Sequence, residues 1–219
     1  MSNSLLAPFA NWGPVPPDNQ EIMPTLGDRI PLRPRPLLAF FARHLLRFFG
    51  WRFDLNGLPN TAKMVIIGGP HTSNWDGIFA ISTTLAAQVD FGMLVKHSAF
   101  KPPFGAILRW FGAIAIDRSA PGGFVAEAVR QCGQREHFLI GISPEGTRGP
   151  APIWKRGFYQ IALGAEVPIA CAFFDYRRKL VGIGPVIHPS GDYAADLEKI
   201  QAFYRTITPR IAKNFVADG

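Results

Sequence analysis

From residue 60 onward, short apolar runs alternate with segments whose apolar residues recur at helical spacing. The short runs suit buried strands and the intervening segments suit helices. Such alternation predicts a single α/β domain, in which helices flank a mixed, partly parallel central sheet. The expected strands are 64–68, 91–95, 113–116, 137–142, 167–173 and 181–183, and the expected helices are 76–87, 103–111, 123–132, 157–163 and 192–215, with Pro209 kinking or splitting the last one.

Two segments of different character precede this domain. Residues 1–36 contain 8 of the 20 prolines and predict an extended, poorly ordered arm. Residues 37–52 predict an amphipathic helix in which Arg43, His44 and Arg47 share one stripe, while Leu, Phe and Trp fill most of the rest. One interpretation is that this helix packs on the core and exposes only a narrow polar face to solvent. The other is that it lies in a membrane interface, with its aromatic side chains inserted and its arginines at the headgroups.

Composition and charge narrow the class of protein. The chain has 219 residues, 47% hydrophobic and 18% charged, which excludes intrinsic disorder and suits one domain with an appendage. Its net charge of +7 favours an acidic partner: nucleic acid, an anionic membrane or a phosphorylated substrate. Residues 29–52 hold six arginines and no acid, beside the apolar run. Because this charge lies in an apolar, Pro-rich arm rather than on a face with interleaved aromatics, we expect an anionic membrane surface as partner and no nucleic acid.

Cysteine use and hydropathy bear on location. Cys132 and Cys171 form no Cys-x-x-Cys pair, zinc spacing or disulfide framework, which favours a reducing, cytosolic setting. The N-terminus lacks the charged start and apolar core of a secretory signal, and the sequence has no run of about 18 apolar residues. We therefore expect a peripheral protein at the cytoplasmic face of the cell membrane.

The first candidate site is the segment 68–77, Gly-Gly-Pro-His-Thr-Ser-Asn-Trp-Asp-Gly, which joins an expected strand to an expected helix. Open α/β folds place ligands at such strand ends. Asp76 can fold back onto one nitrogen of the His71 imidazole and fix its tautomer, which leaves the other nitrogen to act as a general base. The alternative is equally open on this pattern: His71 is a structural loop residue and Asp76 caps the helix.

The sequence shows neither a covalent nucleophile nor a metal site beside this pair. In the segment 141–146, Gly-Ile-Ser-Pro-Glu-Gly, the second glycine comes one position too late for the Gly-x-Ser-x-Gly elbow of serine hydrolases. The five histidines show no metal-binding spacing, and Walker and Rossmann glycine motifs are absent. A base without a nucleophile suits direct attack by a substrate hydroxyl on an activated acyl donor.

Two further motifs follow expected strands. In the turn Pro-Glu-Gly-Thr-Arg after residues 137–142, Arg148 can grip a phosphate through two hydrogen bonds, Glu145 can bond hydroxyls, and Gly146 leaves backbone amides unobstructed. The strand expected at 113–116 ends in Asp-Arg. Taken singly, an Asp–Arg pair is most often a surface ion pair and Pro-Glu-Gly-Thr an ordinary turn. Three motifs at strand ends in this order favour one shared site.

In this order the motifs resemble those of the glycerolipid acyltransferases, the family typified by 1-acylglycerol-3-phosphate acyltransferase. Residues 71–76 resemble the family's His-x-x-x-x-Asp motif, 112–118 its Gly-x-x-x-Ile-Asp-Arg block, and 144–148 its Pro-Glu-Gly-Thr-Arg turn. Lys96, with Pro103 and Gly105, resembles the family segment that precedes the Gly-x-x-x-Ile-Asp-Arg block. Val167-Pro-Ile169 resembles the start of the family's last motif. Residues 154–159 resemble the sequence variant found in a shorter bacterial branch of the family. The resemblance covers roughly residues 60–175.

The resemblance implies an acyltransferase domain, which we place at residues 53–219. It implies His71 as the base and Asp76 as its partner. The substrate-binding residues it implies are Lys96, Arg118, Glu145, Gly146, Thr147 and Arg148. The implied donor is a fatty acyl thioester of CoA or of acyl carrier protein, and the acceptor is a hydroxyl of a lysophospholipid-like molecule, with lysophosphatidate first. We expect neither cofactor nor metal.

Three departures from the family pattern leave the acceptor open. Ser98 stands where an acidic residue is usual, Ser143 replaces an aromatic residue, and Cys171 replaces a second proline. An acyltransferase with a non-phosphoglycerol lipid acceptor is therefore an alternative. A lipid esterase or thioesterase, which needs the missing elbow, and a non-catalytic membrane-binding protein are two further classes.

Overall fold

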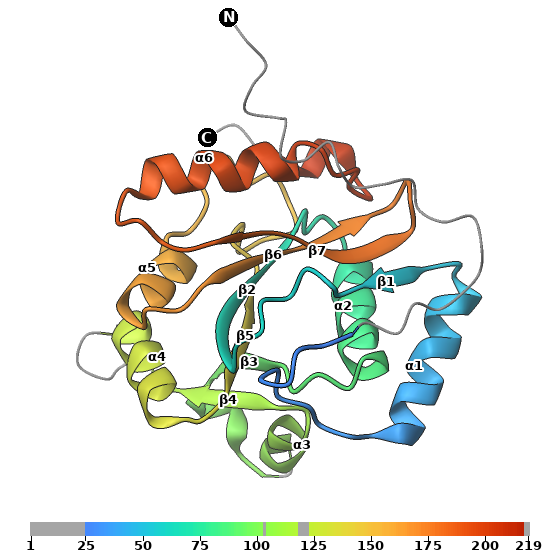
Figure 1. The fold of residues 1–219 in the computed structure, drawn as a ribbon, viewed down its shortest axis with the longest axis horizontal. Helices are drawn as coiled ribbons and strands as arrows, with labels where there is room; N and C mark the ends of the chain where they lie inside the picture. Colours follow the sequence, from blue (N-terminus) through green and yellow to red (C-terminus); the bar gives the residue numbers. More distant parts are fainter. Residues whose placement is uncertain (1–24, 103, 118–122, 217–219) are drawn as a thin grey trace, which may run out of the picture.

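Strands and helices alternate along the chain as the hydrophobic pattern predicts. The computed structural model describes residues 25–102, 104–117 and 123–216 (Figure 1). The strands in these ranges are β1 (Arg52–Asp54), β2 (Lys63–Gly69), β3 (Gly92–Lys96), β4 (Ala113–Ile116), β5 (Phe138–Ile142), β6 (Ile169–Asp175) and β7 (Leu180–Ile187). The helices are α1 (Pro36–Phe48), α2 (Asn74–Ala86), α3 (Phe104–Trp110), α4 (Gly123–Gln134), α5 (Gly157–Gly164) and α6 (Tyr193–Tyr204), with short 3-10 helices η2 (His97–Phe100) and η3 (Ala212–Asn214).

One mixed sheet joins the strands in the order β1-β7-β6-β2-β5-β3-β4 (Figure 1). From β6 to β4 every neighbouring pair is parallel, whereas β7 runs antiparallel to β6 and β1 runs parallel to β7. The prediction of an α/β domain with a mixed, partly parallel sheet is confirmed. Since β2 and β5 are parallel neighbours, the loops that leave their carboxyl ends lie side by side.

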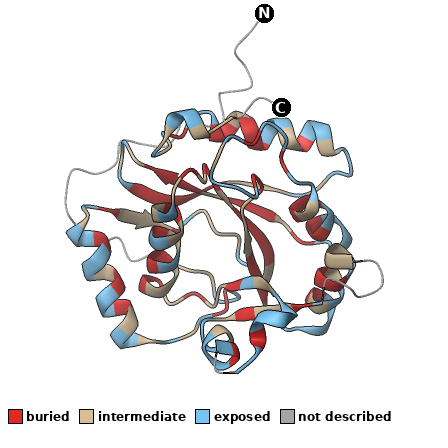
Figure 2. Ribbon diagram, turned by 180° about the vertical axis from the view of Figure 1, so that it is seen from behind, coloured by how far each residue is buried: buried red, intermediate tan, exposed pale blue. Residues whose placement is uncertain are grey.

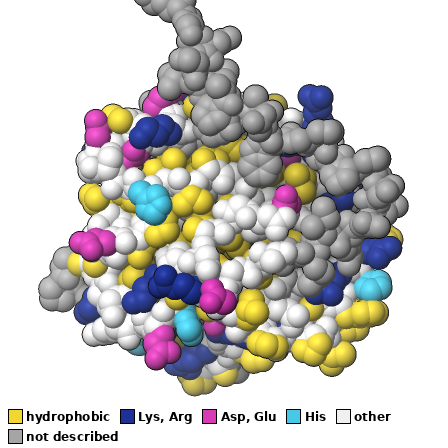
Figure 3. Space-filling view, viewed as in Figure 1, with side chains coloured by type: hydrophobic (Ala, Val, Ile, Leu, Met, Phe, Trp, Pro, Cys, Tyr) yellow, Lys and Arg dark blue, Asp and Glu magenta, His cyan; other side chains and the backbone are white. Residues whose placement is uncertain are grey.

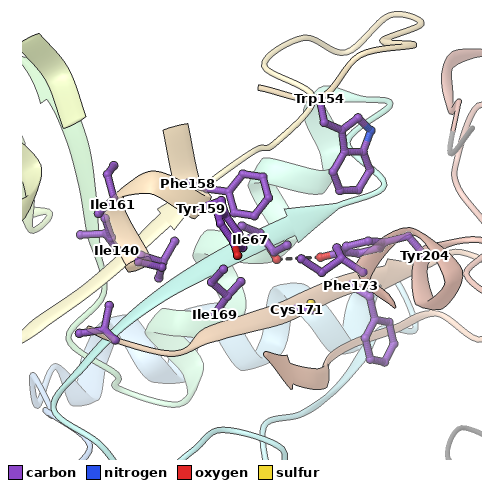
Figure 4. Close-up of a cluster of buried hydrophobic side chains, with 14 of the residues drawn as sticks. Ile67, Ile140, Trp154, Phe158, Tyr159, Ile161, Ile169, Cys171, Phe173 and Tyr204 are labelled. Atoms are coloured by element: carbon purple, nitrogen blue, oxygen red, sulfur yellow. Dashed lines mark hydrogen bonds between the residues drawn. The ribbon is translucent and has the colours of Figure 1, made fainter. Parts of the chain in front are cut away.

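Alternate residues of β2 serve two separate cores. Val65 and Ile67 are buried in the cluster that α4, α5 and α6 cover, part of which Figure 4 shows. Met64 and Ile66 face the other side of the sheet, where α1 and α2 pack together. Figure 2 shows the buried residues along the sheet and on the inward faces of the helices. Burial on both faces explains why β2 is a continuous apolar run rather than an alternating one.

The first helix is shorter than expected and is followed by a strand that the pattern does not reveal. Gly50 adopts φ +70, a left-handed conformation that ends helices readily, and α1 stops two residues before it. The chain then enters β1, which pairs with β7. A strand of three residues is too short to show a period in the sequence.

The arm requires a correction where the structure describes it. Residues 25–35 are not poorly ordered but pack on the domain: the Ile30 side chain is 4% exposed and lies in a cluster with Leu55, Met64 and Val89. Leu32 forms an isolated antiparallel bridge with Val89. The apolar residues between the prolines attach this segment to the domain, and the prolines do not prevent it. Residues 1–24 lie outside the described residues.

The last helix also differs from the prediction, because α6 ends at Tyr204 instead of continuing to residue 215. Residues 205–207 form a turn, and Pro209 disfavours helix at the residue before it, so the helix does not resume after the turn. The Tyr204 hydroxyl is fully buried and lies 2.9 Å from the carbonyl oxygens of Ile67 and Ala172, to which it donates (Figure 4). This contact fixes the end of α6 under the carboxyl ends of β2 and β6.

Candidate active site

The loop between β2 and α2, residues 70–73, is called the His71 loop. Ser73 caps α2: its hydroxyl accepts a hydrogen bond from the Trp75 amide, and its own amide donates to Oδ2 of Asp76 at 2.8 Å. This reciprocal cap satisfies two amides at the helix start. The same arrangement turns the Asp76 carboxylate back toward the loop that precedes the helix.

Asp76 and His71 lie together at the carboxyl end of β2. Nδ1 of His71 is 3.4 Å from Oδ2 of Asp76, whose side chain is completely buried, whereas the His71 side chain is 25% exposed. The Asp76 carboxylate also accepts a hydrogen bond of 2.7 Å from the Thr72 amide. With Nδ1 directed at this fixed carboxylate, Nε2 is the nitrogen left to take a proton from a substrate. The structure therefore brings the two predicted residues together, and Asp76 both caps α2 and faces His71.

Tyr176 holds the other oxygen of the Asp76 carboxylate. Its hydroxyl, in the turn between β6 and β7, donates to Oδ1 of Asp76 at 2.6 Å. Burial, and next the Asp76 carboxylate itself, raise the pKa of Tyr176, so the phenol stays a donor at neutral pH. This residue is missing from the sequence-based prediction, since nothing in the pattern around it marks it.

The residues after α6 close over the same loop. Arg210 lies over the rings of Trp75 and Tyr176, with its guanidinium carbon 5.3 and 5.9 Å from their centroids. The Ile211 amide donates to the Thr72 hydroxyl at 3.3 Å. These contacts join the last described segment of the chain to the His71 loop.

Glu145 lies in the turn after β5, residues 143–149, which is called the Glu145 turn. Its Oε1 accepts a 2.9 Å hydrogen bond from the His71 amide, while the described residues offer no partner to its buried Oε2. The side chain is almost completely buried. Burial raises the pKa of Glu145 to about 7, although the His71 amide opposes the shift and the Asp76 charge adds to it. Near neutral pH this carboxyl group is thus a hydrogen-bond donor in a large fraction of molecules.

Three residues of the Glu145 turn, Gly146, Thr147 and Arg148, are exposed. Gly146 adopts φ +65, and a Cβ at this position would approach the Lys155 side chain to 2.6 Å. The Thr147 hydroxyl accepts from the Gly149 amide at 3.2 Å. The Arg148 guanidinium donates to the side-chain oxygen of Asn74, which is the first residue of α2. Arg148 therefore lies at the start of the helix that carries Asp76.

Two predicted substrate-binding residues are not brought into this cluster. Lys96 ends β3 with an exposed side chain, and β5 separates β3 from β2, which puts the two strands about 10 Å apart. Arg118 lies outside the described residues. Within residues 25–102, 104–117 and 123–216, no group of three His, Cys, Asp or Glu side chains has the arrangement of a metal site.

Comparison with known families places this geometry in a class of enzymes. Residues 53–174 match the acyltransferase family, and this span is more than half of the chain. The chain therefore belongs to the acyltransferase family, as its motifs predict. The match ends before Tyr176 and before the segment that carries Arg210.

Among solved structures, the chain is similar to PlsC, the 1-acyl-sn-glycerophosphate (LPA) acyltransferase of Thermotoga maritima. The TM-score is 0.54 at 15% sequence identity, over 78% of this chain and 76% of that one. At this identity the likeness concerns the fold. No curated protein matches the chain.

Proposed function

We propose that this acyltransferase moves a fatty acyl group from a thioester of CoA or acyl carrier protein to the hydroxyl of a lysophospholipid-like acceptor, with lysophosphatidate as the first choice. The observation that carries the proposal is the approach of the His71 imidazole, through Nδ1, to the buried Asp76 carboxylate. A partly exposed imidazole held in this way is a general base. The activity would place the enzyme in phospholipid biosynthesis.

The proposed reaction needs no covalent acyl-enzyme intermediate. Nε2 of His71 takes the proton of the acceptor hydroxyl while its oxygen attacks the thioester carbonyl carbon. The tetrahedral intermediate then expels the thiolate, which receives the proton from the imidazolium, so that an ester and a free thiol are formed. The Asp76 charge stabilises the transient imidazolium, and Tyr176 and the Thr72 amide keep that carboxylate in place.

The proposed headgroup site lies on the Glu145 turn. Arg148 would bind the acceptor phosphate through two hydrogen bonds. The family resemblance assigns Lys96 and Arg118 to the same headgroup, although Lys96 lies apart from the cluster around His71. Gly146 and Thr147 shape the turn, and the protonated form of Glu145 donates a hydrogen bond to an oxygen of the acceptor. A neutral lipid acceptor is the alternative that the experiments below distinguish.

The test of the base is the His71→Ala variant, assayed with acyl-CoA and acyl carrier protein donors against lysophosphatidate and neutral lysolipids. Turnover should fall about 10²- to 10⁴-fold, the usual contribution of a general base. His188→Ala is the matched control, because this exposed histidine follows β7 at the opposite edge of the sheet. Near-wild-type turnover of His71→Ala with the best acceptor would disprove the assignment.

The test of the headgroup site is Arg148→Ala. The KM for phosphorylated acceptors should rise about tenfold or more, while the KM for neutral acceptors stays the same. Arg135→Ala, which removes an exposed arginine at the far end of β5, is the control. An equal loss for both acceptor classes would argue against phosphate binding by Arg148.

The proposed location is the cytoplasmic face of an anionic membrane, with α1 at the interface. Among the described residues, none of the helices has both the length and the apolar character needed to cross a bilayer. The buried side of α1 is made by the small residues Ala39 and Ala42 together with Leu46, whereas most of its large apolar side chains, above all Leu37, Phe41 and Phe48, are exposed. Exposed aromatic residues on a basic helix support an interfacial position.

A further inference from the structure

Helix α3 presents an apolar stripe to solvent. Phe104, Ile107, Trp110 and the following residue Phe111 are 43 to 65% exposed, and their spacing of three to four residues puts them on one side of the helix. In this helix of seven residues, Gly105 is the one buried residue. Exposed apolar groups gathered in this way mark a contact surface rather than scattered surface hydrophobes.

This stripe is attached to the beginning of α1. The Arg35 guanidinium stacks over the Trp110 ring at 4.1 Å and donates to the Trp110 carbonyl oxygen, to which Arg33 also donates at 3.2 Å. The residues that lead into α1 and the last residue of α3 are therefore held together. In Figure 3 hydrophobic side chains gather along the lower right of the molecule, where Figure 1 shows α1, and below it toward α3.

The charge around α3 indicates what covers the stripe. The segment 93–111 contains Lys96, Lys101 and Arg109 and no acidic residue. Arg33, which also pairs with Asp90 at 2.7 Å, and Arg35 contact the stripe at Trp110, and the other three cations are close to it along the chain. Apolar and aromatic groups bordered by arginine and lysine fit the boundary between the acyl chains and the headgroups of an anionic bilayer.

We propose that α3 is a second membrane-contact element, and that it inserts its apolar stripe into the same anionic lipid surface as α1. This proposal rests on the proposed function, in which α1 contacts the membrane, and adds α3 as a second contact. A membrane in contact with both helices would also lie beside the candidate active site. Helix α3 begins after the carboxyl end of β3, the end at which the site lies on β2. At the end of α1, the Phe49 ring lies 5.0 Å from the ring of Trp75 in α2. Substrate could then pass between bilayer and site without crossing bulk water.

The first experiment places a fluorescent probe on α3. Ile107→Cys is labelled with an environment-sensitive thiol dye and mixed with phosphatidylglycerol vesicles. The native thiols of Cys132 and Cys171 are at most 2% exposed and do not compete for the dye. Emission should shift to the blue for Ile107→Cys and stay unchanged for Leu163→Cys, whose position on α5 covers the opposite face of the sheet. An equal response at both positions, or none at Ile107→Cys, overturns the proposal.

The second experiment measures binding. The double variant Phe104→Ser, Ile107→Ser should bind phosphatidylglycerol vesicles about tenfold more weakly than the wild type, since it loses two inserted side chains. Leu163→Ser should bind like the wild type. Turnover of a water-soluble short-chain donor and acceptor should stay unchanged in both variants, which separates failure of the membrane contact from failure of the proposed chemistry.

Three results would contradict the proposal. Unchanged vesicle binding by the double variant would show that the stripe does not insert. A change in oligomeric state of the double variant without lipid would instead assign the stripe to a second copy of the chain. Lower activity with an acyl carrier protein donor, at unchanged vesicle binding, would assign it to that acidic protein.

Discussion

The Tyr176 hydroxyl donates a 2.6 Å hydrogen bond to Oδ1 of Asp76, so that Oδ2 is the oxygen that faces His71. The two residues are 100 positions apart in the chain. A carboxylate fixed at both oxygens cannot rotate away from the imidazole. In the proposed mechanism Tyr176 is thus a positioning residue that acts on His71 through Asp76.

Tyr176→Phe removes this hydrogen bond and should lower kcat about three- to tenfold, as expected for the loss of one hydrogen bond of about 1 kcal/mol. The acidic limb of the kcat/KM profile should move to higher pH, because a carboxylate with one fewer hydrogen bond holds the imidazolium proton more tightly. The measurement is kcat/KM against pH. Tyr193→Phe is the control, since that buried hydroxyl has no partner among the described residues. An unchanged pH profile would mean that Tyr176 has only a structural role.

Glu145→Gln should change how stability depends on pH. The folded-state pKa of Glu145 is raised to about 7 from 4.5, so the unfolded chain ionises first as pH rises. Stability present below about pH 4.5 is therefore lost as pH rises through about 7, by roughly 1 to 3 kcal/mol. Glutamine keeps the acceptor for the His71 amide and cannot ionise. Urea unfolding between pH 4.5 and 8 should show a smaller decline for Glu145→Gln than for the wild type; parallel curves would refute the raised pKa.

Gly146→Ala should distort the Glu145 turn. Alanine is strained at φ +65 by about 1 kcal/mol, and its Cβ would push against the Lys155 side chain. We expect a several-fold higher KM for the acceptor, measured by steady-state kinetics, with little loss of overall stability. Gly149→Ala is the matched control in the same turn, because the nearest atom to its Cβ, the Thr147 hydroxyl, is 3.8 Å away. Equal kinetics for the two variants would count against a role of Gly146 in the site.

Asp196→Ala should destabilise the fold by about 2 to 4 kcal/mol, because it leaves the buried Tyr159 hydroxyl without its acceptor and removes three further hydrogen bonds of a buried carboxylate. Its carboxylate accepts from the Tyr159 hydroxyl, from the Ser190 amide and hydroxyl, and from Lys199. Although burial opposes the shift, these bonds lower the pKa of Asp196 to about 2.

The stabilisation by Asp196 is therefore complete above about pH 4 and is lost as pH falls toward 2. Urea unfolding of the wild type and of Asp196→Ala at pH 7 and at pH 3 checks the size of the stability loss and its dependence on pH. Asp192→Ala, which removes the cap of α6, should lose only about 1 kcal/mol. A similar small loss for Asp196→Ala would contradict the network.

Sequence reasoning predicts the parts of the site that lie close together along the chain. His71 and Asp76 are five residues apart across a strand-to-helix turn, and their geometry follows from the cap of α2. The contact between Glu145 and the His71 amide requires β5 beside β2, an order that periodicity does not determine. Tyr176 comes from a distant turn with no motif around it, so only the folded chain reveals it.

The outer helices show a similar limit. The apolar run in 37–52 predicts a helix, but its period does not tell that Ala39 and Ala42 face inward while Phe41 and Phe48 face outward. Small residues allow close packing on α2, and the Arg43 side chain donates to the Ala86 carbonyl at the end of that helix. A hydrophobicity scale assigns the larger residues to the core and therefore predicts the wrong side of the helix as the buried one.

The attachment of Tyr204 and Ile211 to β2 and to the His71 loop has a consequence for the order of assembly. These contacts span about 140 residues, and such long-range closures form late in folding. During synthesis α1, α3 and β2 leave the ribosome long before the segment that contacts the His71 loop, so the helices proposed to contact the membrane are made first. A nascent chain could therefore meet the bilayer while its active site is still open, and acquire activity only once the segment after α6 has docked.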